Sequence, residues 1–198
     1  MKKKKLLTIL CSVFCFFNLF FPHWGTGGFA FAQKETFPKG YFLFPINPGQ
    51  KNTLAGVLGD LRTNHFHAGI DIRTQQREGL QVLAAADGYI SRIKVQTTGY
   101  GNVIFIKHPN GMTTVYGHLL SYAEPMGSYL RQKQYERKSF DIELNPSPEQ
   151  FPVRKGQLIA LSGNTGGSAG PHLHFEIRDS KDSYLNPLFF EFSEVEDD

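Results

Sequence analysis

Cysteine is nearly absent from this 198-residue sequence, which contains two. Both, Cys11 and Cys15, lie in the apolar run from Leu6 to Phe21, so the chain beyond that run has none. It therefore has no disulfide to stabilise it and no thiolate to act as a nucleophile or metal ligand. Stability must come from a packed core, and any catalysis from side chains such as histidine and carboxylates.

A strong basic charge is lacking as well. The sequence has 21 basic and 18 acidic residues, but four of the lysines, Lys2–Lys5, precede the apolar run, and an Ala30-Phe31-Ala32 motif follows it. This pattern predicts a secretory signal peptide over residues 1–32. An uncleaved membrane anchor is the alternative, but the run is shorter than the roughly 20 residues that span a bilayer.

Removal of those four lysines leaves 17 basic against 18 acidic residues, a net charge of −1. This balance argues against a nucleic-acid partner. We expect an exported protein of the periplasm, cell envelope or extracellular space, with no stable membrane anchor after cleavage.

Internal repeats and long helical periodicity are also missing. Turns containing glycine separate short runs rich in Val, Ile, Tyr and Phe, which is typical of an all-β domain. We predict one domain over residues 33–190, built as a curled antiparallel sheet or an open, barrel-like sandwich. The expected strands are Tyr89–Val95, Val103–Lys107, Met112–Leu119, Gln157–Leu161 and His172–Arg178.

A polar segment, residues 121–152, interrupts these short strands, and only Tyr129–Lys138 within it shows helical periodicity. We interpret the segment as an insertion on the surface. The alternative is a lid, because the segment starts three residues after His118. The acidic residues 191–198 are either a tail or the start of a missing region.

Two histidines stand at the start of the last predicted strand. Polar and apolar residues alternate along His172–Arg178 after a glycine-rich turn, which is typical of a half-buried strand. The alternation places His172 and His174 on one face, roughly 6.5 to 7 Å apart. Histidines on a solvated strand often have no special role, but here both rings can serve one site.

Two upstream residues suit the same site. His67 and Asp71, joined by a histidine from elsewhere, offer three ligands with an open fourth position, the pattern of catalytic zinc. In a straight strand the two would lie roughly 13 Å apart. We therefore expect the chain to bend at Gly69, which lies between them.

Other polar residues near these motifs have competing interpretations. The predicted strand Met112–Leu119 puts Tyr116 and His118 on one face, so Tyr116 is either an oxyanion donor or a packing residue. Glu176 either supports the site or lies at the surface, since no His-Glu-x-x-His helix makes it a general base. His108, beside Pro109, is interpreted as a turn residue.

The order of these motifs resembles the lysostaphin/LytM-type zinc endopeptidases, which cut peptide cross-bridges of bacterial peptidoglycan and have a duplicated-hybrid-motif fold. The resemblance runs from Asn64 to Pro187 and is carried by His67-x-x-x-Asp71, Tyr116-Gly-His118, Gly163-Asn-Thr-Gly166 and Gly170-Pro-His172-Leu-His174-Phe-Glu176. It implies that His67, Asp71 and His174 bind Zn²⁺. It also implies that His118 and His172 are an unliganded catalytic pair.

The chemistry of these residues agrees with that implication. Zinc held by two imidazoles and one carboxylate supplies an activated water and a Lewis acid. One of His118 and His172 takes the water proton, and the protonated form stabilises the oxyanion or serves the leaving amine. The sequence leaves open which histidine has which role.

We therefore predict a zinc metalloendopeptidase of peptidoglycan, active in cell-wall remodelling or lysis. The alternative is a non-catalytic peptidoglycan-binding activator of other hydrolases, but such family members have lost ligands and all five positions are filled here. A D-Ala-D-Ala carboxypeptidase would show a different order of motifs, and a purely structural envelope protein would not explain five such residues. The bond that is cut and the oligomeric state are open at this stage.

Overall fold

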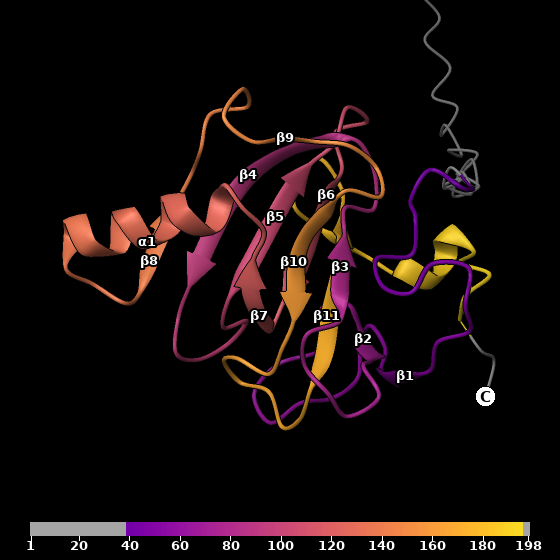
Figure 1. Cartoon of the computed structure of the whole chain (residues 1–198). Coiled ribbons are helices and arrows are strands. Elements are labelled where there is room, and N and C mark those ends of the chain that lie inside the picture. The colour runs from indigo at the N-terminus through magenta and orange to yellow at the C-terminus, as the bar shows by residue number, and fades with distance from the viewer. Residues whose placement is uncertain (1–38, 196–198) are drawn as a thin grey trace, which may run out of the picture. The chain divides into compact units, whose positions relative to one another are not determined.

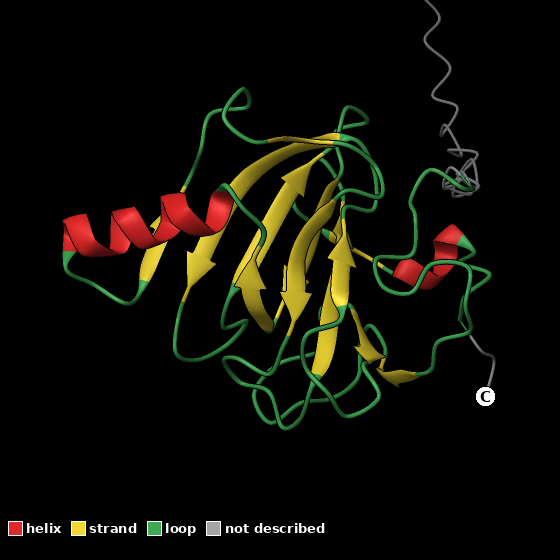
Figure 2. Ribbon diagram, viewed as in Figure 1, coloured by secondary structure: helices red, strands yellow, loops and turns green. Residues whose placement is uncertain are grey.

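The computed structural model describes residues 39–195, so the expected signal peptide, residues 1–32, lies outside the described residues. The described chain forms two antiparallel sheets (Figures 1 and 2). The spatial order of the larger sheet is β1 (Leu54–Gly56), β2 (Ile70–Arg73), β11 (His172–Arg178), β6 (Thr113–Gly117), β5 (Val103–Lys107), β4 (Gly88–Val95) and β8 (Ile142–Leu144), with β12 (Tyr184–Leu185) on β11 and β9 (Pro152–Val153) on β4.

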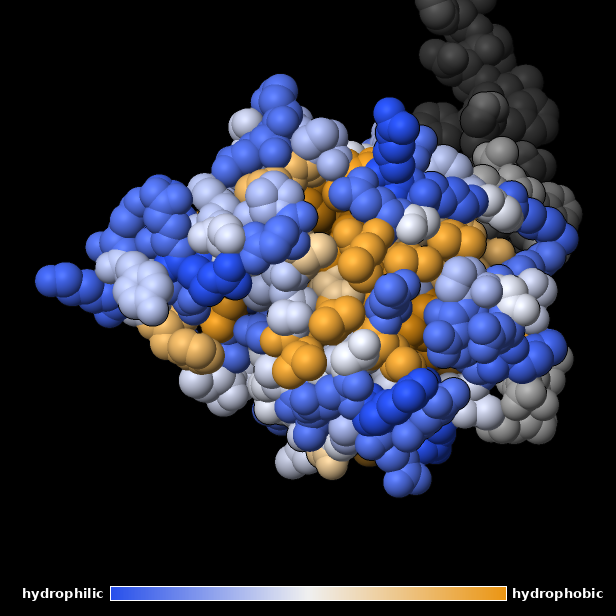
Figure 3. All heavy atoms as spheres, in the orientation of Figure 1, coloured by the Kyte–Doolittle hydropathy of each residue, from blue (hydrophilic) through white to orange (hydrophobic). Residues whose placement is uncertain are grey.

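The smaller sheet packs on the larger one. It consists of β3 (Gln81–Leu83), β10 (Leu158–Ser162) and β7 (Leu119–Tyr122), with β10 in the middle. Ile104 of the larger sheet and Ile159 of the smaller one lie in the same buried core. Figure 3 shows apolar side chains over the smaller sheet framed by polar ones, and Leu120 and Leu158 are exposed there. The prediction of an antiparallel all-β fold is confirmed, as two open sheets rather than a closed barrel.

Strand β11 is an interior strand of the larger sheet, between β2 and β6. Leu173, Phe175 and Ile177 enter the core, as the alternation predicts. The opposite face is not solvated, because Glu176 is fully buried and Arg178 is 6% exposed. The expectation of a half-buried strand is therefore wrong: β2 and β6 flank β11 in the sheet, and other side chains cover its polar face.

The predicted strand Met112–Leu119 is broken at His118, which has φ of +58°. Strand β6 ends at Gly117, and the chain continues as β7 in the other sheet. This left-handed residue interrupts the side-chain alternation. The expectation that His118 and Tyr116 share a strand face is therefore wrong.

The polar insertion contains a helix, α1 (Met126–Arg137), and strand β8. The sequence predicts a helix that begins at Tyr129, three residues after the observed start at Met126. Strand β8 pairs with β4 at the edge of the sheet opposite to β1 and β2 (Figure 1). The insertion thus lies at the sheet edge remote from β2, which carries Asp71.

The C-terminal part of the described chain forms a short 3₁₀ helix, η1 (Pro187–Phe190), and then runs beside the segment before β1. The backbone N–H of Asn52 donates to the carbonyl of Glu194 at 2.6 Å. The boundaries expected at residues 33, 190 and 191 stay predictions. Among the described residues no helix is both long and apolar enough to cross a membrane.

Candidate metal centre

Three donor atoms converge at one end of β2 and β11. Nε2 of His67 lies 2.9 Å from Oδ1 of Asp71 and 3.0 Å from Nδ1 of His174. The third side of this triangle, from His174 Nδ1 to Asp71 Oδ1, is 2.9 Å. All three residues are buried, and they form a cluster able to hold a metal ion.

The sheet register brings these residues together. His174 and Asp71 are directly opposite each other in the antiparallel pair of β11 and β2, although they are far apart in the sequence. His67 precedes β2, so the two upstream residues do not lie on one straight strand. The expected bend falls beside Gly69, where a β-carbon would lie 2.2 Å from the carbonyl oxygen of Phe175. Only glycine lets the two backbones approach this closely.

Neighbouring groups fix the tautomer of both ligand candidates. Nδ1 of His67 lies 2.8 Å from the carbonyl oxygen of Val57, and Nε2 of His174 lies 2.9 Å from Oε1 of Glu176. Both partners only accept hydrogen bonds, so these two nitrogens carry protons. The other ring nitrogens, Nε2 of His67 and Nδ1 of His174, therefore point their lone pairs at Asp71 when the rings are neutral.

Three facing acceptors require a positive charge between them. Burial lowers the pKa of His174, but hydrogen bonds with Asp71 and Glu176 outweigh it and raise the pKa to about 9. Burial raises the pKa of Asp71, yet hydrogen bonds with three histidine rings leave it far below its usual range. Without another cation the cluster thus attracts a proton to His174. Two nitrogens and one carboxylate oxygen about 3 Å apart also suit the tetrahedral ligand spacing of Zn²⁺, so the residues fit a zinc ion.

A charged group supports Asp71 from outside the cluster. Nη2 of Arg62 donates to Oδ2 of Asp71 at 2.9 Å, which leaves Oδ1 for the cluster. The sequence did not single out Arg62, because an arginine in an irregular segment carries no pattern of its own.

His118 and His172 lie beside the cluster, with ring centroids 4.7 Å apart. Nδ1 of His118 is 2.8 Å from the carbonyl oxygen of Thr165, and Nδ1 of His172 is 2.8 Å from that of Gly170. A backbone carbonyl therefore holds Nδ1 of both rings, and Nε2 of His172 is 3.3 Å from Oδ1 of Asp71. Burial, followed by repulsion from neighbouring rings, lowers the pKa of His118 to about 4.

These side chains line an open groove of about 1460 Å³. Its rim carries Leu61 and Phe66, which pair through an isolated β-bridge and are 80% and 71% exposed. No residue between His118 and Gly167 lines the groove, so the insertion does not cover it in the described chain. The lid interpretation of residues 121–152 thus has no support in the described structure.

A buried polar network backs His174. Oε1 of Glu176 accepts from Tyr100 Oη at 2.6 Å, and Oε2 accepts from Nε of Arg178 at 2.7 Å. Arg178 also binds both carboxylate oxygens of Asp182 at 3.0 Å. Glu176 thus supports the site, one of its two expected roles. Tyr100 was missed, although a tyrosine between two glycines at a turn is a usable signal.

Tyr116 and His108 belong to the core rather than the groove. Tyr116 is fully buried, and its hydroxyl accepts from the backbone N–H of Ala85 at 2.9 Å. Thr114 Oγ1 joins this hydroxyl to Nε2 of His108, at 2.9 and 2.8 Å. The packing role is therefore the one that the structure gives Tyr116. His108, 3% exposed, is a core residue as well as a turn neighbour.

The fold and the converging donors define a β-sheet protein with a candidate site for one metal ion. The sequence model of peptidase family M23 matches residues 65–135 and 144–187, more than half of the chain. The chain belongs to this family, which confirms the resemblance seen in the motifs. All five residues predicted for the site lie in the matched segments.

Individual relatives carry different names. The chain is 34% identical over 141 residues to the DD-carboxypeptidase/endopeptidase Mpg of Neisseria meningitidis, an alignment covering 71% of this chain and 23% of the relative. It is 34% identical over 142 residues to the murein hydrolase activator EnvC of Escherichia coli, covering 71% and 27%. The chain thus spans about a quarter of the length of these curated relatives.

Among solved structures, the catalytic domain of the antimicrobial peptidase lysostaphin from Staphylococcus simulans has the same fold. Its TM-score is 0.51 at 24% identity, covering 69% of this chain and 90% of that domain.

Proposed function

We propose that this protein is a zinc-dependent endopeptidase that hydrolyses peptide cross-bridges of bacterial peptidoglycan. The proposal rests on one observation above all: His67, Asp71 and His174 turn three acceptor atoms to one point, while Val57 and Glu176 hold the opposite ring nitrogens. Membership of the peptidase family, and the word endopeptidase in the name of a relative, support it.

In this proposal the ion is held by Nε2 of His67, Nδ1 of His174 and Oδ1 of Asp71. When bound, zinc supplies a Lewis acid and lowers the pKa of a coordinated water. Arg62 keeps the Asp71 carboxylate oriented through its second oxygen. Glu176 keeps the ring of His174 in the tautomer that a metal requires.

His118 and His172 form the proton-transfer pair. A backbone carbonyl fixes Nδ1 of each ring, so Nε2 is the nitrogen that transfers the proton. One ring accepts the proton of the attacking water, and the pair then delivers a proton to the leaving amine. A protonated ring also stabilises the negative charge that develops on the carbonyl oxygen.

The groove suits an extended substrate. It is open and larger than the roughly 300 to 1,000 Å³ of a typical small-molecule pocket. A peptide cross-bridge attached to glycan strands needs such open access. Export to the periplasm or cell envelope belongs to the same proposal, since peptidoglycan lies outside the cytoplasmic membrane.

A second candidate function is activation of other cell-wall hydrolases without catalysis. The name of the EnvC relative favours it. The filled positions of His67, Asp71 and His174 and of the histidine pair favour catalysis, because an activator needs no such set.

Incubation of the purified protein with isolated peptidoglycan separates the two candidates. We expect soluble fragments whose masses correspond to a hydrolysed cross-bridge, with none from the His118→Ala variant. If the parent releases no fragments but accelerates a separate cell-wall hydrolase, and His118→Ala does so equally, the activator function replaces our proposal.

A further inference from the structure

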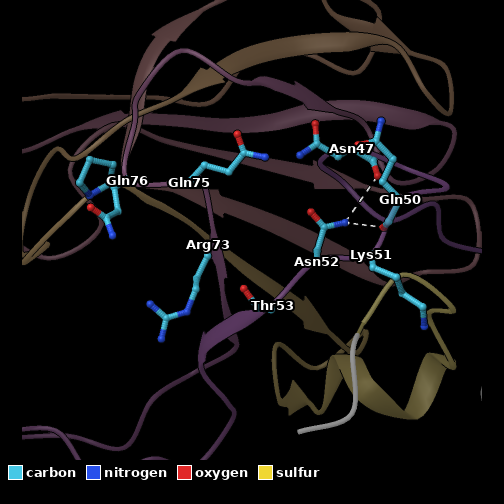
Figure 4. Close-up of a pocket in the computed structure, with 9 residues that line it drawn as sticks. Asn47, Gln50, Lys51, Asn52, Thr53, Arg73, Gln75 and Gln76 are labelled. Atoms are coloured by element: carbon cyan, nitrogen blue, oxygen red, sulfur yellow. Dashed lines mark hydrogen bonds between the residues drawn. The ribbon is translucent and has the colours of Figure 1, made fainter.

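A smaller polar pocket adjoins the groove. It has a volume of about 390 Å³ and lies between two segments, residues 47–53 and 73–76 (Figure 4). The pocket shares Arg73, Gln76 and Pro171 with the lining of the groove. A molecule lying in the groove can therefore extend into this pocket.

Two cations and no carboxylate line this pocket. Lys51 and Arg73 are both exposed, and neither forms an ion pair within residues 39–195. Nε of Arg73 donates to the carbonyl oxygen of Leu54 at 3.1 Å. This bond holds the side chain while its two terminal nitrogens remain available to a ligand. The pocket thus attracts an anion.

Asn52 adds a hydrogen-bond acceptor. It is 6% exposed, and its Nδ2 donates to the carbonyl oxygens of Gln50 and Asn47 at 2.8 and 3.5 Å. Because these bonds fix the amide nitrogen, Oδ1 points into the space between the two segments (Figure 4). Its oxygen takes part in no hydrogen bond among the residues that the structure describes, so it is free to accept an N–H of a ligand.

The opposite segment contributes amide groups. Gln75 and Gln76 both have left-handed backbones, with φ of +57° and +58°. Non-glycine residues in this conformation are strained and often occur at ligand sites. The amide of Gln75 points toward Asn47 and Asn52 across the pocket (Figure 4).

We propose that this pocket is a subsite for a carboxylate group of the substrate peptide, one that is remote from the bond being cut. The guanidinium of Arg73 binds the carboxylate, Lys51 adds positive charge to the same pocket, and Asn52 Oδ1 accepts the N–H of the adjoining peptide unit. Arg73 lies two residues after Asp71 on β2, so the subsite is fixed relative to the metal centre. This inference rests on the proposed endopeptidase function.

The test compares two synthetic cross-bridged peptides, one with free carboxylates away from the scissile bond and one with the same groups amidated. We expect the parent to show a lower KM for the acid form. The Lys51→Gln/Arg73→Gln variant should raise the KM of the acid peptide about tenfold or more, the effect of losing hydrogen bonds to a charged group. Its kcat, and its KM for the amidated peptide, should change little.

Matched controls are Lys107→Gln and Arg154→Gln, which replace exposed cations outside both pockets. They should leave both KM values at the parent level. Thermal unfolding of all variants checks that the loss of the Arg73 to Leu54 bond has not altered the fold.

Two results overturn the subsite while leaving the proposed function in place: cleavage of both peptides by the parent with equal KM, or an equal rise in both KM values in the double variant. If the parent cleaves neither peptide, the proposed function fails instead. Calorimetric binding of the two peptides then decides the subsite alone, and equal affinity for acid and amide forms rejects it.

Discussion

Nε2 of His174 donates a hydrogen bond to Oε1 of Glu176 at 2.9 Å, and this contact turns Nδ1 of the same ring toward Asp71. Glu176 is fully buried, and Arg178 binds its other oxygen. Burial raises the pKa of Glu176, but hydrogen bonding to His174 and nearby positive charge lower it below the usual value. An ionised carboxylate two residues away thus sets the tautomer of a proposed zinc ligand.

The variant Glu176→Gln removes this charge with little change in shape. We expect zinc affinity about 10- to 100-fold lower, because partners of this kind raise the basicity of a ligating imidazole. Competition with a chelating dye measures the affinity. Tyr100→Phe removes only a neighbouring hydroxyl from Glu176 and should have a smaller effect. Unchanged affinity in Glu176→Gln would show that the carboxylate serves only to pair with Arg178.

Gly69→Ala places a methyl group against the carbonyl of Phe175 in β11. The two strands must then separate, so we expect unfolding to become easier by about 1 to 3 kcal/mol and zinc to bind more weakly. Gly170→Ala is the control, because nothing lies within 4 Å of the added β-carbon there. Urea unfolding and the same dye competition test both variants. Equal stability and equal zinc affinity of the two variants would contradict the need for a glycine where the chain at Gly69 approaches β11.

Tyr116→Phe distinguishes a core role from an oxyanion role. The change leaves the buried N–H of Ala85 without its partner, which costs about 1 to 3 kcal/mol of stability. Because the hydroxyl lies in the core, kcat for cleavage of a cross-bridged peptide should stay at the parent value. A large fall in kcat with unchanged stability would return Tyr116 to the catalytic site.

The stability of the protein should depend on pH through His108. Burial lowers the pKa of His108, and the hydrogen bond to the carbonyl of Asp87 opposes this only in part. The unfolded chain binds a proton more readily, so the contribution of the neutral ring is present above about pH 6.5 and is lost as the pH falls below it. The free energy of unfolding, measured with urea, should fall more between pH 7.5 and pH 5 for the parent than for His108→Gln. An identical loss of stability in the two proteins would exclude His108 as the source of the pH dependence.

Local patterns predicted where the chain places the candidate site residues better than they predicted the surroundings of those residues. The two-residue period of a strand was enough to put His172 and His174 on one side, and the bend at Gly69 follows from the distance between His67 and Asp71. The burial of Glu176 depends on which strands flank β11, and sheet neighbours are set by contacts distant in the sequence.

His118 shows a different limit. Continued alternation would have placed its ring on the side of Tyr116, toward the core, but its positive φ redirects the ring toward His172. Left-handed backbone at a non-glycine residue has no reliable sequence signal. Arg62 was missed for a related reason, since only the folded loop before β2 brings it to Asp71.

The most direct test of the account is zinc content measured beside turnover in the parent, His174→Ala and His118→Ala. We predict one zinc per parent chain with cleavage of peptidoglycan cross-bridges, and neither property in His174→Ala. His118→Ala should keep its zinc but lose at least about 100-fold in kcat, as expected when a proton-transfer group is removed. Cross-bridge cleavage by zinc-free parent protein, or parent-level turnover by either variant, would contradict the account.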